Sequence, residues 1–193
     1  MIAAPSLADR SIHVVIENPA GSFEKWEVQS SGRLVQEFRD GQPVRIPELP
    51  WPANAGMIPR TLLSEELGGD REPLDVLVLG DPLERGELVR AVPIALLRVV
   101  DRLERDDKII AVLPGTPYAE SESMEELDQA FPGLGEQLAE WYEIARPGSA
   151  IEVQGLGSRA AAQLLIAEGA LAFENALRTG NLPDWDSAGG DGR

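Results

Sequence analysis

Short apolar segments with the alternation typical of β-strands fill the first 112 residues of the chain, and they constrain its fold more than any other feature. Glycine, proline and asparagine turns separate these segments. The predicted strands cover Ile12–Glu17, Glu24–Val28, Leu34–Phe38, Leu74–Leu79, Leu88–Val100 (one or two strands) and Lys108–Val112. Many short strands joined by turns predict a closed or strongly twisted sheet, which is a small β-barrel.

Helical signals are confined to the last third of the chain. Ser123 and Glu126 have the spacing of a capping box, and Gly180 has the position of a helix C-cap. The predicted elements are a helix from Ser123 to about Ala145 with a break at Pro132-Gly133, a strand at Ala150–Gln154 and a helix from Ser158 to about Arg178. The predicted fold class is therefore α+β, mainly β, with two flanking C-terminal helices. We expect one domain over residues 1–180 and a disordered tail over residues 181–193, which has no apolar periodicity.

Composition excludes several classes of function. The 193-residue chain has 17 basic and 33 acidic residues, a net charge of −16, so it is a poor match for nucleic acid, which needs a basic face. It has no cysteine and a single histidine, His13, which excludes disulfides, thiolate sites, histidine triads and multi-histidine zinc sites. No apolar run approaches the roughly 20 residues that span a bilayer, and no signal-peptide pattern is visible. We expect no membrane partner and a cytoplasmic location.

Residues 39–61 are rich in proline and are predicted to hold little regular structure. A long irregular stretch inside a small domain is often functional. We therefore expect this stretch to contribute to a site.

Carboxylates gather at the predicted strand ends. Three of them crowd into the turn Asp70-Arg71-Glu72-Pro73-Leu74-Asp75, where the proline stiffens the backbone. The full set is Glu17, Asp70, Glu72, Asp75, Asp101 and Asp106, and a small barrel brings such strand ends together. Crowded acids repel one another unless a positive charge lies among them, and Mg²⁺ takes oxygen ligands. For the turn alone, a solvated acidic loop is the alternative interpretation.

Two cations, Lys25 and Lys108, occupy predicted strand positions among these acids. Acids that hold metal ions, with lysines directed at the same cavity, are what phosphoryl transfer to water requires. The residues therefore indicate a metal-dependent site for a small phosphorylated substrate.

Four motifs in the correct order resemble the soluble inorganic pyrophosphatases of the family I, barrel-forming type. The resemblance runs from about Ile12 to Leu177. The motifs are V-V-I-E-N-P-A at Val14–Ala20, K-W-E at Lys25–Glu27, D-R-E-P-L-D-V-L-V at Asp70–Val78, and the D-x4-D-x-K spacing of Asp101, Asp106 and Lys108. Each motif alone is weak, whereas four in order are specific.

The resemblance implies a small, twisted, OB-like barrel of five strands and hydrolysis of pyrophosphate to two phosphates. It also implies several Mg²⁺ ions in each active site, with Mn²⁺ as an alternative ion, and a homo-oligomeric assembly. The substrate would be pyrophosphate or another small phosphorylated compound.

The same resemblance assigns roles to individual residues. Asp70, Asp75 and Asp101 would hold two tight metal sites, Asp106 would join Asp101 on a further metal, and Glu17 would act through water or a substrate-bound metal. Glu72 and Asp75 would be catalytic. Lys25, Lys108, Tyr142 and Arg39 would bind phosphate oxygens, and Glu27 would lie in the outer shell.

The sequence also departs from the family pattern. The aspartate that helps to activate water is Glu72, and one extra methylene moves its oxygens by roughly 1 Å, which can cost on the order of 10²-fold in rate. A phosphate-binding tyrosine is replaced by Ala55, an arginine by Glu37, and the lysine after Tyr142 by Glu143. Four arginines are candidates for the missing cations: Arg39, Arg45, Arg60 and Arg71. Arg71 is alternatively a charge partner for the acidic turn.

Three hypotheses follow. The first is an active pyrophosphatase with altered substrate-clamp residues. The second is a paralogue with the same fold and metal site that acts on another phosphoanhydride or phosphate ester, since Ala55 and Met57 would open the pocket. The third is a weak or inactive relative that serves as a binding or assembly partner.

Overall fold

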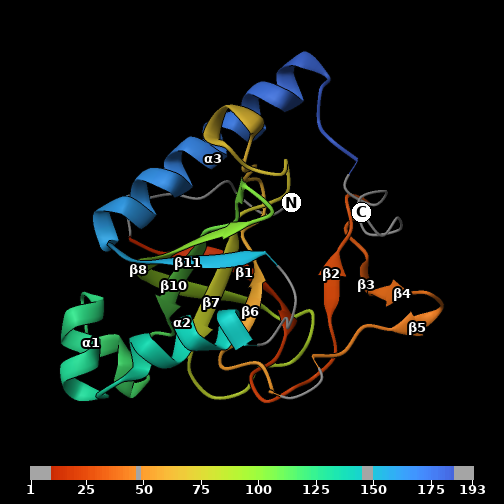
Figure 1. Ribbon diagram of the computed structural model, residues 1–193. Helices are drawn as coiled ribbons and strands as arrows, with labels where there is room; N and C mark the ends of the chain where they lie inside the picture. The colour runs from red at the N-terminus through yellow and green to blue at the C-terminus, as the bar shows by residue number, and fades with distance from the viewer. Residues whose placement is uncertain (1–9, 47–48, 145–149, 185–193) are drawn as a thin grey trace.

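The computed structural model describes residues 10–46, 49–144 and 150–184 of the chain. It consists of one ring of strands, three α-helices and a pair of small hairpins that project from the ring (Figure 1). The longest helix, α3 (Arg159–Thr179), lies along one outer side, whereas the shorter α1 (Met124–Ala130) and α2 (Leu134–Ile144) lie at the opposite end of the ring.

Five strands close into a ring, as the predicted five-stranded barrel requires. Their order around the ring is β1 (Ile12–Asn18), β6 (Asn54–Met57), β7 (Asp75–Leu79), β10 (Lys108–Val112) and β8 (Leu88–Asp101), which returns to β1. β8 closes the ring because it is long: its first residues pair with β1 and the rest pair with β10 and β11 (Ile151–Ser158). All ring pairings are antiparallel except that of β7 with β10, which is parallel.

Both faces of β7, β8 and β10 are buried, which explains why their sequences read as nearly continuous apolar runs. One core contains Leu77, Leu97 and Ile110 and is covered by side chains of α1 and α2. The other contains the alternate residues of the same strands together with Leu165 and Ile166 of α3. The strands thus follow the period of two that a pleated sheet imposes.

The helix signals in the sequence are confirmed. The Ser123 hydroxyl accepts a hydrogen bond from the Glu126 backbone N–H at 3.2 Å, and the predicted break at Pro132-Gly133 separates α1 from α2. Ser158 caps α3, and Gly180 closes it in the left-handed conformation with φ +71°. The predicted helix end near Ala145 and residues 185–193 of the predicted tail lie outside the described residues.

Two predictions of secondary structure are wrong. Residues 39–61, where no strand was expected, contain β5 (Gln42–Pro43) and the whole of β6. The predicted strand Leu34–Phe38 divides into β3 (Leu34–Gln36) and β4 (Phe38–Arg39). The β6 sequence Asn-Ala-Gly-Met has no β-branched residue, so pairing with β1 and β7 on either side imposes the strand. Gly56 makes this possible, because a Cβ there would lie 2.1 Å from the Val15 carbonyl oxygen.

The N-terminal meander is also interrupted. β2 (Trp26–Val28) pairs with β3 and not with β1, so these two strands form a sheet of their own, and β4 with β5 forms another. We call residues 24–45, which include β2 to β5, the arm. In Figure 1 the arm stands beside the ring, in orange and red.

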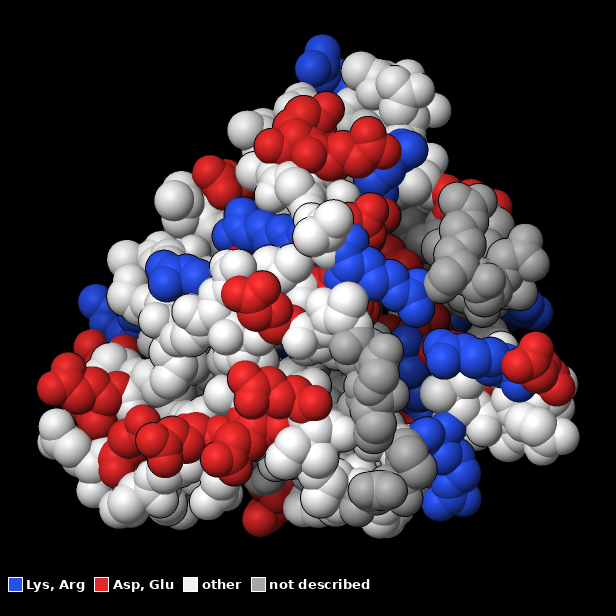
Figure 2. Space-filling view, in the orientation of Figure 1, with Lys and Arg blue, Asp and Glu red and all other residues white. Residues whose placement is uncertain are grey.

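The surface reflects the acidic composition. In Figure 2 acidic side chains gather over the lower left of the visible face, where α1 and α2 lie in Figure 1. Of the helices in the described ranges, none combines the length and apolar character needed to cross a bilayer.

Candidate active site

A cavity of about 1020 Å³ lies between the ring and the arm. It is lined by all ten residues that the sequence predicts for the site: Glu17, Lys25, Arg39, Asp70, Glu72, Asp75, Asp101, Asp106, Lys108 and Tyr142. Residues up to 125 positions apart in the sequence are therefore brought to one place, from four ring strands or their ends, the arm and α2.

At the inner end of the cavity the parallel pair β7–β10 sets the geometry. Asp75 and Lys108 are the first residues of these two strands and lie directly opposite each other in register. The Lys108 ammonium group contacts the carboxylates of Asp75 and Asp106, and its side chain is only 6% exposed. Burial alone would lower the pKa of Lys108, but these two carboxylates outweigh burial and raise the pKa well above its ordinary value. Lys108 is therefore a permanent cation.

Three carboxyl groups of the cavity lining have raised pKa values. Burial, with further contributions from neighbouring acids, raises the pKa of Asp70 to about 6 and that of Glu72 to about 8. Burial and the nearby Asp75 raise the pKa of Glu17 well above its ordinary value. An Asp70 oxygen also accepts a hydrogen bond from the Glu72 backbone N–H at 3.0 Å, which fixes the turn between them. The site is short of positive charge.

The whole cavity lining shows the same shortage, since ten acidic and only five basic residues of the described chain line it. Carboxylate oxygens are the donors that hard divalent cations prefer, so the residues fit such a cation chemically. Within the described residues, however, no three Asp, Glu or His side chains are already grouped as a metal cluster. The Lys108 ammonium group lies between two of the acids, Asp75 and Asp106.

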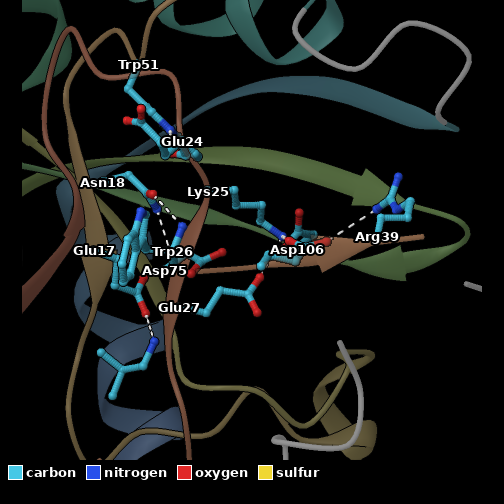
Figure 3. Close-up of polar contacts among 12 residues, drawn as sticks. Glu17, Asn18, Glu24, Lys25, Trp26, Glu27, Arg39, Trp51, Asp75 and Asp106 are labelled. Carbon is cyan, nitrogen blue, oxygen red and sulfur yellow. Dashed lines mark hydrogen bonds and ion pairs between the residues drawn. The ribbon is translucent and has the colours of Figure 1, made fainter. Parts of the chain in front are cut away.

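At the outer end, the arm presents a second lysine. Lys25 Nζ lies 2.6 Å from Glu27 Oε1 and 2.6 Å from Glu37 Oε2. Arg39 Nη2 lies 3.4 Å from the other oxygen of Glu37. Both cations predicted to bind phosphate on the arm are thus held by carboxylates (Figure 3).

Side chains of β1, rather than a strand ladder, attach the arm to the ring. The Asn18 amide donates to the Trp26 carbonyl oxygen at 3.0 Å and accepts from the Trp26 N–H at 2.8 Å, as Figure 3 shows. Glu17 Oε1 accepts from the Val28 N–H at 2.7 Å, and the Arg85 guanidinium lies 4.5 Å from the Trp26 ring centroid. These contacts set the place of Lys25, which precedes Trp26.

The positions that the sequence resemblance marks as departures lie in different surroundings. Ala55 is buried in the cavity wall, beside Trp51 and Tyr142 in the same core. Glu143 is exposed and is absent from the cavity lining, so its charge does not face the site. Tyr142 is 8% exposed and its ring lies 5.8 Å from Lys108 Nζ.

Of the four candidate arginines, only Arg39 lines the cavity. Arg45 lies over Phe23, and Arg60 pairs with Glu174 of α3. The Arg71 guanidinium lies 3.8 Å from Glu65 and 3.4 Å from the Asn181 carbonyl oxygen, in a second, smaller cavity beside α3. These contacts do not support the hypothesis that Arg71 is a charge partner of the acidic turn.

Sequence reasoning missed several residues of the site. Arg102 and Arg105, in the segment between β8 and β10, also line the cavity. Asp107 holds that segment by accepting from the Val99 N–H at 3.0 Å and from Arg105 Nε at 2.6 Å. Asn18 directly follows the conspicuous Glu17, but nothing in the local pattern shows that it reaches across to the arm.

Comparison with known proteins agrees with this geometry. The sequence model of the family described as "Inorganic pyrophosphatase" matches residues 14–174. The chain is 33% identical over 163 residues to the inorganic pyrophosphatase of Xanthomonas campestris pv. campestris, covering 81% of this chain and 86% of the relative. It is 27% identical to the inorganic pyrophosphatase of Xylella fastidiosa over 92% of this chain and 97% of the relative. The soluble inorganic pyrophosphatase of Zea mays is 33% identical, and the chain spans 56% of its length.

Solved structures share the fold. The inorganic pyrophosphatase from Thermus thermophilus superposes with a TM-score of 0.74 over 90% of this chain and 97% of that chain, at 24% identity. The truncated vacuolar soluble pyrophosphatase of Trypanosoma cruzi, solved in complex with PPi, gives a TM-score of 0.84 over 93% of this chain and 74% of that chain, at 19% identity. The family match over most of the chain and the shared fold lead to one conclusion: this chain belongs to the inorganic pyrophosphatase family.

Proposed function

We propose that this chain hydrolyses inorganic pyrophosphate to two phosphates, with Mg²⁺ as its metal ion and a water molecule as the nucleophile. The observation that supports this most directly is the inner end of the cavity, where Asp70, Asp75, Asp101, Asp106 and Lys108 line one space at the ends of adjacent ring strands. Membership of the inorganic pyrophosphatase family supports the substrate.

Electrostatics supports the need for metal. Pyrophosphate is a polyanion, and a cavity lined by twice as many acids as bases would repel it. Bound Mg²⁺ would supply Lewis-acid polarisation of the phosphate oxygens and a lower pKa for the attacking water. We assign Asp70, Asp75, Asp101 and Asp106 to hold the ions, with Glu17 acting through water.

The chain's own residues would perform the remaining tasks. Glu72 and Asp75 would orient the attacking water, and one of them would accept its proton. Lys108, Tyr142, Lys25 and Arg39 bind the oxygens of the phosphates and offset the charge that develops on the leaving group. Lys108 is the best placed of these, since burial fixes its position.

The altered clamp makes another phosphoanhydride or phosphate ester the second candidate substrate. Two observations favour this candidate: Glu27 and Glu37 both form ion pairs with Lys25, and the cavity volume is about 1020 Å³. A larger substrate would use the space beside Ala55.

Phosphate release by the purified protein tests the proposal. We expect release from pyrophosphate with Mg²⁺, slower release with Mn²⁺, and none after EDTA treatment. Release only from a nucleotide or a sugar phosphate would replace the first proposal by the second. Failure to hydrolyse any of these would leave the binding or assembly role.

We further infer a cytoplasmic homo-oligomer. Leu164 and Leu171 of α3 are 60% and 63% exposed and lie seven positions apart, which places them on one helix face. Light scattering of the purified chain would give its mass in solution, and a monomer would contradict the inference.

A further inference from the structure

Glu37 lies where the two hairpins of the arm meet. Its N–H donates to the Lys25 carbonyl oxygen at 2.9 Å, and its own carbonyl oxygen accepts from the Val44 N–H at 2.8 Å. It therefore joins the end of β3 both to the residue before β2 and to the residue after β5. The backbone around Glu37 is fixed on two sides.

The Glu37 side chain is almost buried, with 9% of it exposed, and it faces the cavity. One of its oxygens lies 2.6 Å from Lys25 Nζ and the other lies 3.4 Å from Arg39 Nη2. A buried carboxylate is costly unless it keeps a charged partner. The buried Glu37 carboxylate therefore holds the Lys25 ammonium group in place.

Glu27 contacts the same ammonium group at the same distance, 2.6 Å, but its side chain is 42% exposed. An exposed ion pair contributes little because water replaces either partner at small cost. The two carboxylates around Lys25 therefore differ in kind: one is fixed, and the other is free to exchange.

We propose that Glu37 is a positioning residue for substrate binding, which holds Lys25 at the outer end of the cavity, and that Glu27 is the partner that leaves Lys25 when a phosphate arrives. This inference rests on the proposed function in that the ligand is a pyrophosphate-like anion. It gives a role to a carboxylate at a position where the sequence resemblance predicts a cation. The negative charge orders Lys25 instead of contacting substrate.

The two carboxylates then have opposite effects on binding. Removing the charge of Glu37 leaves Lys25 without its buried partner. The substrate must then order Lys25, and the cost of that ordering weakens binding. Removing the charge of Glu27 takes away a competitor of the phosphate. If both acids merely repelled substrate, both substitutions would tighten binding.

The test compares Glu37→Gln with its matched control Glu27→Gln, since both lose one charge at the same lysine. For Glu37→Gln we expect KM for pyrophosphate to rise roughly tenfold, as for the loss of one charged hydrogen-bond partner, with kcat changed less than about threefold. For Glu27→Gln we expect KM to fall, by about two- to threefold, and a rise in KM equal to that of Glu37→Gln would contradict the proposal. A lower or unchanged KM in Glu37→Gln would overturn the proposal.

A double-mutant cycle separates positioning from folding. In a Lys25→Ala background, Glu37→Gln should change KM by less than about threefold, because its main partner is gone. An undiminished tenfold effect there would show that Glu37 acts elsewhere and would refute the inference. If Glu37→Gln lowers the melting temperature severely, Glu37→Asp keeps the charge and should give a KM between wild type and Glu37→Gln.

Binding of imidodiphosphate with Mg²⁺, measured by calorimetry, makes the result independent of turnover. A wild type that binds this analogue but does not hydrolyse pyrophosphate contradicts the proposed function and still tests Glu37 through the dissociation constants of the variants. A wild type that does not bind the analogue contradicts both.

Discussion

The inner and outer ends of the cavity present similar charges on different supports. At the inner end, Asp75 and Lys108 begin two paired ring strands, and strand ladders on both sides of each fix their backbone. At the outer end, Lys25 lies on an arm whose hydrogen bonds to β1, among the described residues, involve the side chains of Asn18 and Glu17. The Lys108 side chain is 6% exposed at the inner end, whereas that of Arg39 is 67% exposed at the outer end.

This difference bears on where substitutions should be tolerated. A carboxylate fixed by strand ladders, such as Asp75, cannot move without breaking backbone hydrogen bonds, whereas the arm depends on a few side-chain contacts. Among the positions that the sequence resemblance marks as departures, Glu37 lies in the arm, whereas Ala55 lies in the ring strand β6 and Glu72 lies in the turn before β7.

Loss of an inner carboxylate should have the largest effect. We expect Asp75→Asn to lower kcat by at least about 10²-fold, because it removes a charge that the proposed metal ions and Lys108 both use. Phosphate release at saturating Mg²⁺ measures this. The control is Asp81→Asn, an exposed aspartate outside the cavity, which should keep wild-type activity. Comparable losses in the two variants would contradict the assignment.

Glu72→Asp should raise kcat, by about tenfold, if pyrophosphate is the substrate. The shorter side chain restores the reach that the family uses, and misplacement of about 1 Å has a cost of this order or larger. Single-turnover assays would isolate the chemical step. A lower kcat would mean that the longer glutamate suits this cavity and would favour the second candidate substrate.

Weakening the arm should change binding more than chemistry. Asn18→Ala removes two hydrogen bonds to Trp26, so we expect KM to rise by about tenfold with kcat nearly unchanged. Steady-state kinetics gives both constants, and Ser31→Ala at the exposed hairpin turn is the control. A fall in kcat equal to that of Asp75→Asn would erase the distinction between the two ends.

The inner acids predict a pH dependence of stability for the metal-free protein. The pKa values of Glu72 and Asp70 are raised in the folded state, to about 8 and about 6, from ordinary values of 4.5 and 3.8. The folded state therefore holds these protons more tightly than the unfolded chain, and the free energy of unfolding falls as pH rises from about 4 to about 8. We expect the melting temperature in EDTA to fall by about 5 °C over this range.

Two comparisons sharpen that measurement. Glu72→Gln has no carboxyl group to ionise and should show a flatter curve between pH 6 and pH 8. Addition of Mg²⁺ at pH 8 should restore most of the loss. An equally steep curve for the variant would show that the dependence arises from the general negative charge instead of the site.

The smallest effect is expected at Arg71, which adopts φ +68° although it is not glycine. Arg71→Gly relieves roughly 1 kcal/mol of strain from the left-handed backbone conformation. Glycine also raises the conformational entropy of the unfolded chain, which stabilises the unfolded state by a similar free energy. We expect activity to stay within about twofold, because the guanidinium contacts Glu65 and Asn181 instead of the acids. A large loss of activity would return Arg71 to the site.

Much of the fold was predictable because strand and helix periods survive in the sequence. β7, β8 and β10 contribute apolar residues on both faces, β1 alternates with one apolar face, and the Ser123 and Ser158 caps have local signatures. β6 could not be predicted, since its residues have low strand propensity and only two neighbouring strands make it extended. The separation of the arm from β1 likewise depends on the long-range contacts of Asn18.

The site also combines features that local sequence predicts with features that depend on long-range packing. Its ten predicted residues share one cavity, because ordered motifs encode strand ends that the ring brings together. What no motif encodes is the direction of long flexible side chains. Arg45, Arg60 and Arg71 were equally suitable by charge, and only packing shows that they face other partners.

The parallel pairing of β7 with β10 has a consequence for how the protein folds. Asp75 and Lys108 lie 33 residues apart, and β10 also pairs with the intervening β8. A parallel pair of strands cannot be joined by a simple hairpin turn, so pairing β7 with β10 must close a long loop at a cost in chain entropy. Pairing of β10 with β8 helps to offset that cost. The charged centre is therefore a late product of folding, and metal ions should speed the recovery of activity without accelerating the first collapse of the chain.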